Sequence, residues 1–206
     1  MTQGTNDTAG RTAGRPPTLW DRTRQLAAQE ILDTALRLFA QQGYDETTVA
    51  QVAREAGVSQ RTLFRYFGTK EDLVGGSQER FVALLTQAVR DQPLDTDVWG
   101  ALRAAFEASL SLHASPEQAL ERLRLVHRTD SLRAAYLGKR VRCQEELLPL
   151  LEARAPSPDT EGALRTRAVV ATAFAVLDAA MAAWVEGDGR GDILDLYDQG
   201  LAAVRK

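Results

Sequence analysis

Residues 48–67 constrain the fold of this chain more than any other stretch. They contain two segments of helical pattern separated by Gly57, and four positions before this glycine stands Ala53, which is small enough for two helices to cross closely at a steep angle. Ser59 stands just before the second segment, where its hydroxyl can accept from a free amide of the first helical turn. Apolar residues on both sides of the turn are placed to join the two helices: Val52, Ala56, Val58 and Leu63. This pattern predicts a helix-turn-helix with residues 60–65 as its recognition helix.

The composition is that of a globular protein, and the charge distribution places any nucleic-acid surface in the N-terminal third. The 206 residues are 44% hydrophobic, which is enough for one or two small domains with a core. The formal net charge of −3 does not by itself indicate a polyanion as partner. However, residues 1–70 hold nine basic and seven acidic side chains, whereas residues 93–206 hold 14 and 17. The basic excess therefore coincides with the predicted helix-turn-helix.

Apolar residues recur at helical spacing through the chain, and no stretch alternates apolar and polar residues as a half-buried strand would. The fold is therefore predicted to be all-α, with about nine helices. Their limits follow from cap residues, glycines and prolines. The predicted helices are the two within residues 48–67 and those at residues 20–42, 70–90, 97–114, 116–127, 131–155, 159–186 and 192–204.

Two segments leave alternatives open. Gly75 and Gly76 interrupt the predicted helix at residues 70–90, and each costs up to about 1 kcal/mol relative to alanine in a helix interior. They indicate either a hinge or plain close packing. Residues 1–18 cannot bury an apolar face and are expected to form a disordered arm, in which Arg15 either enters a minor groove or is simply solvated.

No catalytic constellation stands out, so neither an enzyme nor a bound cofactor or metal is expected. His113 and His127 lack the spacing of metal ligands, and Cys143 has no neighbour that would activate a thiolate. One cysteine and no signal-peptide pattern favour a cytoplasmic protein. Residues 168–185 are apolar for about the length of a bilayer, but their many alanines, with Thr172 and Asp178, argue against a membrane span.

Over about residues 20–80 the chain resembles the DNA-binding domain of the TetR family of transcriptional regulators. The resemblance is carried by the run ILDTALRLFAQQGYDETTVAQVAREAGVSQRTLFRYFGTKEDLV. The matching positions are Ala35, Phe39, Gly43, Thr47, Thr48, Val49, Ala53, Gly57, Val58, Ser59, Thr62, Leu63, Tyr66, Phe67, Lys70 and Leu73. Phe64 stands where the family more often has tyrosine, and Arg61 where a small residue is frequent. These departures leave the implied fold intact and the operator sequence open.

The resemblance implies a homodimer that places two recognition helices in successive major grooves of a pseudo-palindromic operator in double-stranded DNA, and that represses until a small molecule binds. Gln60 can pair with adenine and Arg61 or Arg65 with guanine, and each good pair contributes about 1–3 kcal/mol of discrimination. Phe64 suits a thymine methyl group, while hydroxyls and an ammonium at helix starts suit phosphates. The predicted DNA-binding residues are Thr47, Thr48, Ser59, Gln60, Arg61, Thr62, Phe64, Arg65, Tyr66 and Lys70.

The chain is thus expected to comprise the arm at residues 1–18, a three-helix DNA-binding domain at residues 19–68 and an effector-binding and dimerisation domain at residues 69–206. The last of these loosely resembles a subgroup in which some members respond to acyl-CoA-like ligands. An apolar pocket for a small hydrophobic effector is predicted there, although its residues can equally fill the core. The candidate ligand-binding residues are Trp99, Phe106, Leu110, Leu123, His127, Tyr136, Arg140, Leu147 and Phe174.

The penultimate helix is apolar nearly all round at residues 168–185, so it needs cover on two sides. One side can be its own domain and the other the same helix of a second copy. The candidate dimer residues are Val170, Leu177, Met181, Trp184, Leu196 and Leu201. Alternatively, this helix is a central one wrapped by its own chain. A rival function is a DNA-binding protein without an effector, whose C-terminal half only dimerises or binds a protein.

Overall fold

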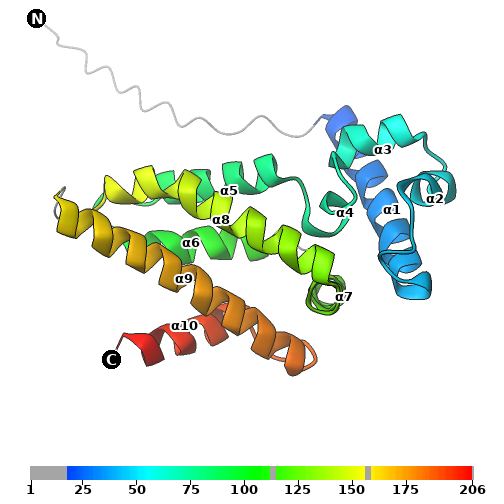
Figure 1. The fold of residues 1–206 in the computed structure, drawn as a ribbon. Helices are drawn as coiled ribbons and strands as arrows, with labels where there is room; N and C mark the ends of the chain where they lie inside the picture. Colours follow the sequence, from blue (N-terminus) through cyan, green and yellow to red (C-terminus); the bar gives the residue numbers. More distant parts are fainter. Residues whose placement is uncertain (1–17, 112–114, 156–158, 206) are drawn as a thin grey trace, which may run out of the picture.

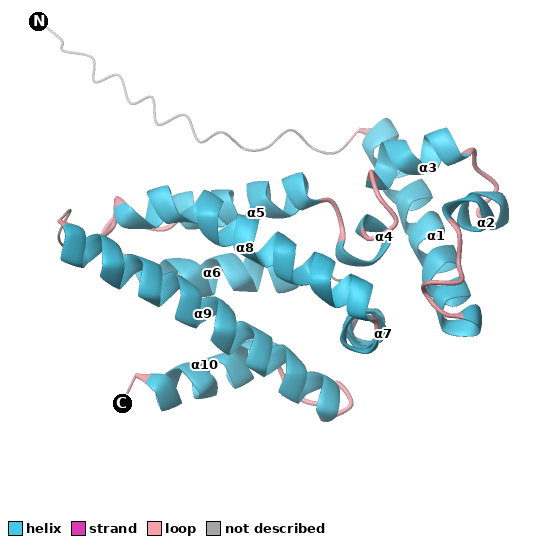
Figure 2. Cartoon of the chain, in the orientation of Figure 1, coloured by secondary structure: helices cyan, strands magenta, loops and turns pink. Residues whose placement is uncertain are grey.

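The computed structural model describes residues 18–111, 115–155 and 159–205, which form ten helices (Figure 1). No strand occurs in these ranges, which confirms the all-α prediction (Figure 2). The predicted arm with Arg15, and His113, lie outside the described residues. In chain order the helices are α1 (Leu19–Gln42), α2 (Val49–Glu55), α3 (Gln60–Phe67), α4 (Asp72–Gly75), α5 (Gln78–Arg90), α6 (Val98–Leu110), α7 (Pro116–Arg128), α8 (Asp130–Glu152), α9 (Thr160–Glu186) and α10 (Ile193–Val204).

The predicted helix at residues 70–90 is two helices, α4 and α5, which is why the described chain has ten rather than nine. Gly76 has φ 72° and ψ 170°, a conformation that strongly favours glycine, and it ends α4. At the other end, a reciprocal capping box confirms the predicted cap. The Thr69 amide donates to Asp72 Oδ2 at 3.3 Å, and the Asp72 amide donates to Thr69 Oγ1 at 3.1 Å. The result is a short helix fixed at its start and bounded by a turn.

The apolar side chains form two clusters, one for each end of the molecule. We call residues 19–75 (α1–α4) the head and residues 78–205 (α5–α10) the body. Ile31, Phe39, Val52 and Leu63 are at most 2% exposed and lie in the head cluster. The short helix α4 adds Leu73 to this cluster, while α7 and α8 of the body contribute Val126 and Leu132. The head is therefore packed directly against one end of the body.

Helix α9 is the central helix of the body. It runs diagonally across the body in Figure 1 and packs against α6, α7, α8 and α10. In the described part of the chain it is the one helix long and apolar enough to cross a bilayer. Its large side chains, among them Phe174 and Trp184, instead lie in the body core. Packing within the chain therefore accounts for the apolar side chains on the face of α9 that meets the body core.

Candidate DNA interface and effector cavity

The crossing of α2 and α3 has the geometry that the sequence predicts. Val52 and Leu63 are fully buried, and Ala53 is 2% exposed. Gly57 has φ 67°, a left-handed conformation that costs glycine little. The Val58 amide then donates to the Ala53 carbonyl at 2.9 Å and closes the turn. The helix-turn-helix is therefore confirmed, and its two helices are held at a fixed angle.

Ser59 is the N-cap of α3, also as predicted. Its Oγ accepts from the Thr62 amide at 3.0 Å and lies 2.9 Å from Thr62 Oγ1. The next two residues, Gln60 and Arg61, are exposed in the first turn of the helix. Because the cap fixes where this turn begins, it also fixes the direction in which these side chains leave the helix.

One face of α3 is free of the rest of the head. Leu63 anchors the helix from its buried side, whereas Gln60, Arg61 and Arg65 are exposed and Phe64 is 44% exposed. An amide, two guanidinium groups and an aromatic edge on one exposed helix are the side chains that distinguish adenine, guanine and thymine in a major groove. The arrangement suits base recognition.

The two threonines before α2 differ in what they can reach. Thr48 is exposed and caps α2, because its Oγ1 accepts from the Gln51 amide at 3.2 Å. Thr47 is 0% exposed, and its hydroxyl donates to the Gly43 carbonyl at 2.7 Å while accepting from Gln42 at 3.0 Å. The Thr47 hydroxyl is thus buried and engaged on both sides within the head, so this structure offers it no route to a phosphate. Thr48 keeps a position suited to it.

Lys70 is used inside the head in this structure. Its Nζ donates to the Tyr44 carbonyl at 2.6 Å and lies 4.1 Å from the centre of the Tyr44 ring. Burial lowers the pKa of the Lys70 ammonium, against the nearby acids. In this structure Lys70 therefore stabilises the loop that precedes α2. The ring of Tyr66, the neighbouring candidate, is tilted by 46° to that of Phe67 with centroids 6.5 Å apart, and the Arg65 guanidinium lies 5.7 Å from the centre of the Tyr66 ring.

A cavity opens in the body where α4 of the head meets α5–α9. The volume open to the centre of a water molecule is about 150 Å³. Its wall is mostly apolar, and six of the nine predicted ligand-binding residues line it: Phe106, Leu110, Leu123, Tyr136, Arg140 and Phe174. The Phe106 and Phe174 rings meet edge to face, with centroids 5.0 Å apart. Sequence positions far apart thus converge on one site, which we call the body cavity.

Three predicted ligand-binding residues lie elsewhere. Leu147 is fully buried in the body core away from the cavity wall. Trp99 lies near the start of α6, where the Arg205 guanidinium sits 5.3 Å from the centre of its ring. His127 is in the last turn of α7, and its backbone carbonyl accepts a hydrogen bond from Arg133. We leave these three out of the proposed site.

Two of the polar residues on the cavity wall, Tyr136 and Arg140, are joined through Asp178. The Tyr136 hydroxyl donates to Asp178 Oδ1 at 2.8 Å, and Arg140 forms an ion pair with the same carboxylate. Burial raises the pKa of Tyr136 to about 12, so its hydroxyl stays protonated and remains a donor near neutral pH. The Arg140 Nε atom is buried and has no hydrogen-bond partner in the described structure.

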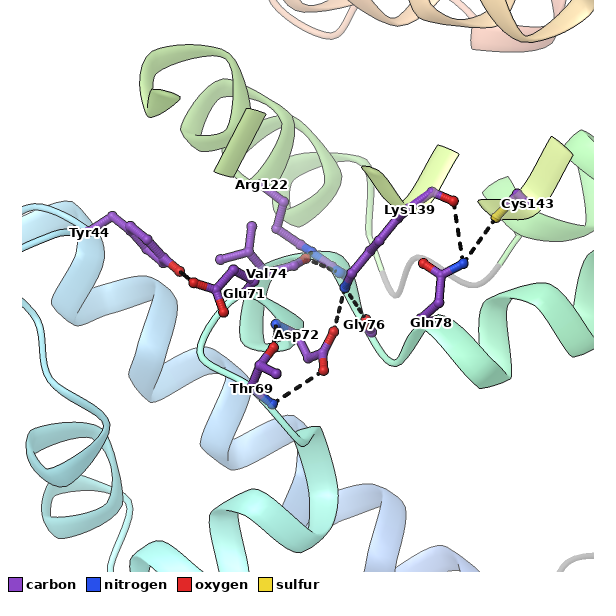
Figure 3. A network of polar contacts seen from close by, with 10 residues as sticks. All are labelled: Tyr44, Thr69, Glu71, Asp72, Val74, Gly76, Gln78, Arg122, Lys139 and Cys143. Atoms are coloured by element: carbon purple, nitrogen blue, oxygen red, sulfur yellow. Dashed lines mark hydrogen bonds and ion pairs between the residues drawn. The ribbon is translucent and has the colours of Figure 1, made fainter. Parts of the chain in front are cut away.

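The body holds α4 through two cations (Figure 3). Lys139 of α8 pairs with Asp72 and donates to the Gly76 carbonyl at 2.8 Å. Arg122 of α7 donates to the Val74 carbonyl, from Nε at 2.7 Å and also from Nη2. Cations at the C-terminal end of a helix interact favourably with its exposed carbonyls. The end of α4 is thereby fixed from two body helices at once.

Comparison with known proteins shows which family the chain belongs to. The sequence model of the bacterial regulatory proteins, tetR family, matches residues 31–75. Over 183 residues the chain is 30% identical to the HTH-type transcriptional regulator TcmR of Streptomyces glaucescens, covering 84% of this chain and 79% of TcmR. The chain belongs to the TetR family. As a TetR-family protein it is a helix-turn-helix transcriptional regulator.

Two solved structures have a similar fold over most of the chain. FadR from Bacillus subtilis, in complex with stearoyl-CoA, has a TM-score of 0.53 at 21% identity and covers 84% of this chain and 95% of FadR. SmeT, in complex with triclosan, has a TM-score of 0.55 at 17% identity and covers 87% of this chain and 91% of SmeT. At these identities the likeness concerns the arrangement of helices.

Sequence reasoning missed Arg122 and Lys139, the two cations by which the body holds α4. A signal for Arg122 exists in the sequence, since it stands three residues after Ala119 and four before Val126, on the buried stripe of α7. For Lys139 no such signal exists, because its partners lie on another element and come close only in the fold.

The residues predicted for the dimer interface face the body core of the single chain. Val170, Leu177, Met181, Trp184 and Leu201 are at most 9% exposed in the single chain, and Leu196 packs against the same core. The physical reason is that α9 is apolar on every side, so helical periodicity cannot tell its inner face from its outer one. Its largest side chains face inward. The outward stripe consists of small residues: Ala168, Ala171, Ala175, Ala179 and Ala183.

Proposed function

We propose that this regulator is a repressor that leaves its operator when a small hydrophobic effector fills the body cavity. The observation that carries the proposal is the position of α4. Val74 and Gly75 line the body cavity, while Leu73 and Val74 lie in the head core. A molecule in the cavity therefore touches the same four-residue helix that packs against α1 and shares the head core with Leu63 of the recognition helix. Small shifts of a tightly packed element are passed to its neighbours, since packed cores deform little.

On the DNA side, α3 supplies the contacts that depend on base identity. Gln60 is assigned to adenine, Arg61 and Arg65 to guanine, and Phe64 to a thymine methyl group or sugar. Thr48 at the start of α2 and Tyr66 on α3 are assigned to phosphates, which fix orientation rather than sequence. Ser59 and Thr62 act through the cap that positions the recognition helix. Lys70 reaches a phosphate only if it gives up its bond to the Tyr44 carbonyl.

The apolar wall supports a hydrophobic effector. Phe106, Leu110, Leu123 and Phe174 provide contact area without hydrogen-bond requirements, and Tyr136 and Arg140 provide orientation. The ligands named for the two structural neighbours, stearoyl-CoA and triclosan, both carry apolar bodies. An acyl-CoA-like effector is accordingly one member of the proposed class.

We place the dimer contact on the outward alanine stripe of α9 in a cytoplasmic homodimer. Small side chains let two helices approach closely, and a helix that already packs on one side by its large residues has only this side free. Leu164, 68% exposed, extends the stripe toward the start of α9. Two copies joined here would place two recognition helices on one pseudo-palindromic operator.

A binding-site selection with the full-length protein, followed by fluorescence anisotropy on the selected duplex, tests the proposal. We expect a two-fold related sequence bound far more tightly than random DNA, and loss of binding when members of a panel of hydrophobic molecules stabilise the protein in thermal melts. A ligand present at about 100 times its dissociation constant stabilises by about 2.7 kcal/mol, which such melts detect. Stabilisation without any change in operator affinity would refute effector control and leave DNA recognition intact.

A further inference from the structure

Arg122 is a cation without an anionic partner on the wall of the body cavity. It is partly buried on α7, and both of its hydrogen-bonding nitrogens donate to a single neutral acceptor, the Val74 carbonyl. None of the ion pairs formed among the described residues includes it. Burial lowers the pKa of its guanidinium, and no nearby acid offsets this effect.

The other two cations of the same wall already have anionic partners. Lys139 pairs with Asp72, and Arg140 pairs with Asp178. The acid that lines the wall, Glu71, acts on groups of the head: it accepts a hydrogen bond from the Tyr44 hydroxyl at 3.2 Å and favours the charged form of Lys70, and it forms no ion pair with Arg122 among the described residues. Arg122 is therefore the cation of this wall without an anionic partner, and the unpartnered Arg140 Nε is a second donor on the same wall.

A guanidinium held in mostly apolar surroundings by a carbonyl alone has paid the desolvation cost of burial without the gain of an ion pair. Hydrogen bonds between an ionised donor and an ionised acceptor are roughly twice as strong as neutral ones, and a carboxylate can accept two of them from one guanidinium. We infer that the effector of the body cavity is an apolar molecule with a single carboxylate or equivalent anionic group, and that Arg122 binds this group inside the cavity. The inference rests on the proposed function, because it assigns the ligand class of the same site.

The assignment also gives a chemical reason why a bound effector would loosen the hold of the body on α4. Arg122 now holds the C-terminal end of α4 through the Val74 carbonyl. An anion in the cavity is the stronger acceptor and draws the guanidinium away from this carbonyl. Of the two body cations that hold α4, Lys139 alone then remains bound to it. The ligand's charge, and not only its bulk, weakens the connection between body and head.

Matched acids and alcohols test this inference on the full-length protein. Octanoic, decanoic, dodecanoic and 2-naphthoic acids are compared with the corresponding primary alcohols by isothermal titration and thermal melts. We expect the acids to bind at least about tenfold more tightly than their alcohols, as expected for one added charge-assisted pair in a desolvated site. In Arg122→Gln the acids should lose this advantage, whereas the alcohols should bind within about threefold of the wild type.

Two further variants separate charge from structure. Arg122→Lys keeps the charge and should keep a preference for acids. Arg154→Gln is a matched control, because Arg154 also donates only to backbone carbonyls, those of Val89, Gln92 and Pro93, but lies outside the body cavity. It should leave the acid preference unchanged. If Arg122→Gln does not fold, the comparison of acid and alcohol on the wild type and on Arg122→Lys still decides.

Equal affinity of acids and alcohols for the wild type would overturn the inference, as would an equal loss of both in Arg122→Gln. If the alcohols also release operator DNA in that case, the proposed function stands and only the ligand class is wrong. If no member of either series binds, the inference fails. Continued operator binding in the presence of every molecule of a broader panel would then refute the proposed function as well.

Discussion

The ion pair between Lys139 and Asp72 links the body to α4, and replacing one partner should reveal its contribution to stability. The Lys139 side chain is 22% exposed and that of Asp72 is 14% exposed, so neither charge has full access to water. In Lys139→Met the Asp72 carboxylate stays largely buried, and the Thr69 amide is the donor that remains to it among the described residues. Removing one partner of a well-buried pair costs about 3–5 kcal/mol, and partial exposure brings the expectation to about 2–3 kcal/mol.

The perturbation is measured by a double-mutant cycle in urea. Asp72→Asn removes the charge but keeps an oxygen that can accept from Thr69, so the cap survives. We expect each single variant to lower the free energy of unfolding and the double variant to lose about 2 kcal/mol less than the sum, because no unpaired charge remains. For a chain of this size a loss of 2–3 kcal/mol corresponds to a drop of about 4–12 °C in Tm.

An exposed pair provides the matched control. Arg165 and Glu161 are 68% and 82% exposed and lie one turn apart on α9, so the same cycle there should give a coupling within about 0.5 kcal/mol. If the Lys139–Asp72 cycle were additive to that same margin, the ion pair would contribute nothing measurable, and α4 would not be held by the body in the way we describe.

Three further predictions address recognition, assembly and alkaline stability. Gln60→Ala and Arg61→Ala should each lose about 1–3 kcal/mol on the selected operator and little on random DNA, measured by anisotropy at fixed salt, and equal losses on both DNAs would contradict their assignment to bases. Ala175→Asp should shift the mass in light scattering from dimer to monomer while Ala175→Ser stays dimeric, and an unchanged dimer would remove the alanine stripe from the interface. Because folding raises the pKa of Tyr136 from 10.0 to about 12, its contribution to stability is complete below pH 10 and is lost as the pH rises through 12. The variant Tyr136→Phe should therefore lose less stability over this interval than the wild type, and identical pH profiles would show that the buried hydroxyl does not matter.

The head could be derived from sequence because its determinants are local. A small residue at the crossing, Ala53, a glycine in the left-handed turn, Gly57, and a cap hydroxyl, Ser59, lie within seven consecutive positions and fix the angle between α2 and α3. Local signals of this kind act through backbone geometry and nearest neighbours. The same holds for the capping box that starts α4.

The parts that the sequence left open depend on contacts between distant elements. An all-apolar helix does not show which side meets its own core, and so Trp184 was assigned to the dimer although it is 4% exposed in the single chain. Thr47 and Lys70 match the pattern of phosphate contacts, but a hydroxyl or an ammonium can satisfy itself on nearby carbonyls. The role of Arg122 becomes visible only once α4 and α7 are side by side.

Reciprocal linkage between operator and effector is the measurement that tests the central claim most directly. If the body cavity and the recognition helix are coupled through α4, an effector that weakens operator affinity by some factor must itself bind more weakly, by the same factor, when operator is present. With the tightest acid of the matched series and the selected operator, we predict that both factors agree and exceed about fivefold, the lower range of allosteric coupling. An effector affinity that is the same with and without operator would contradict the account.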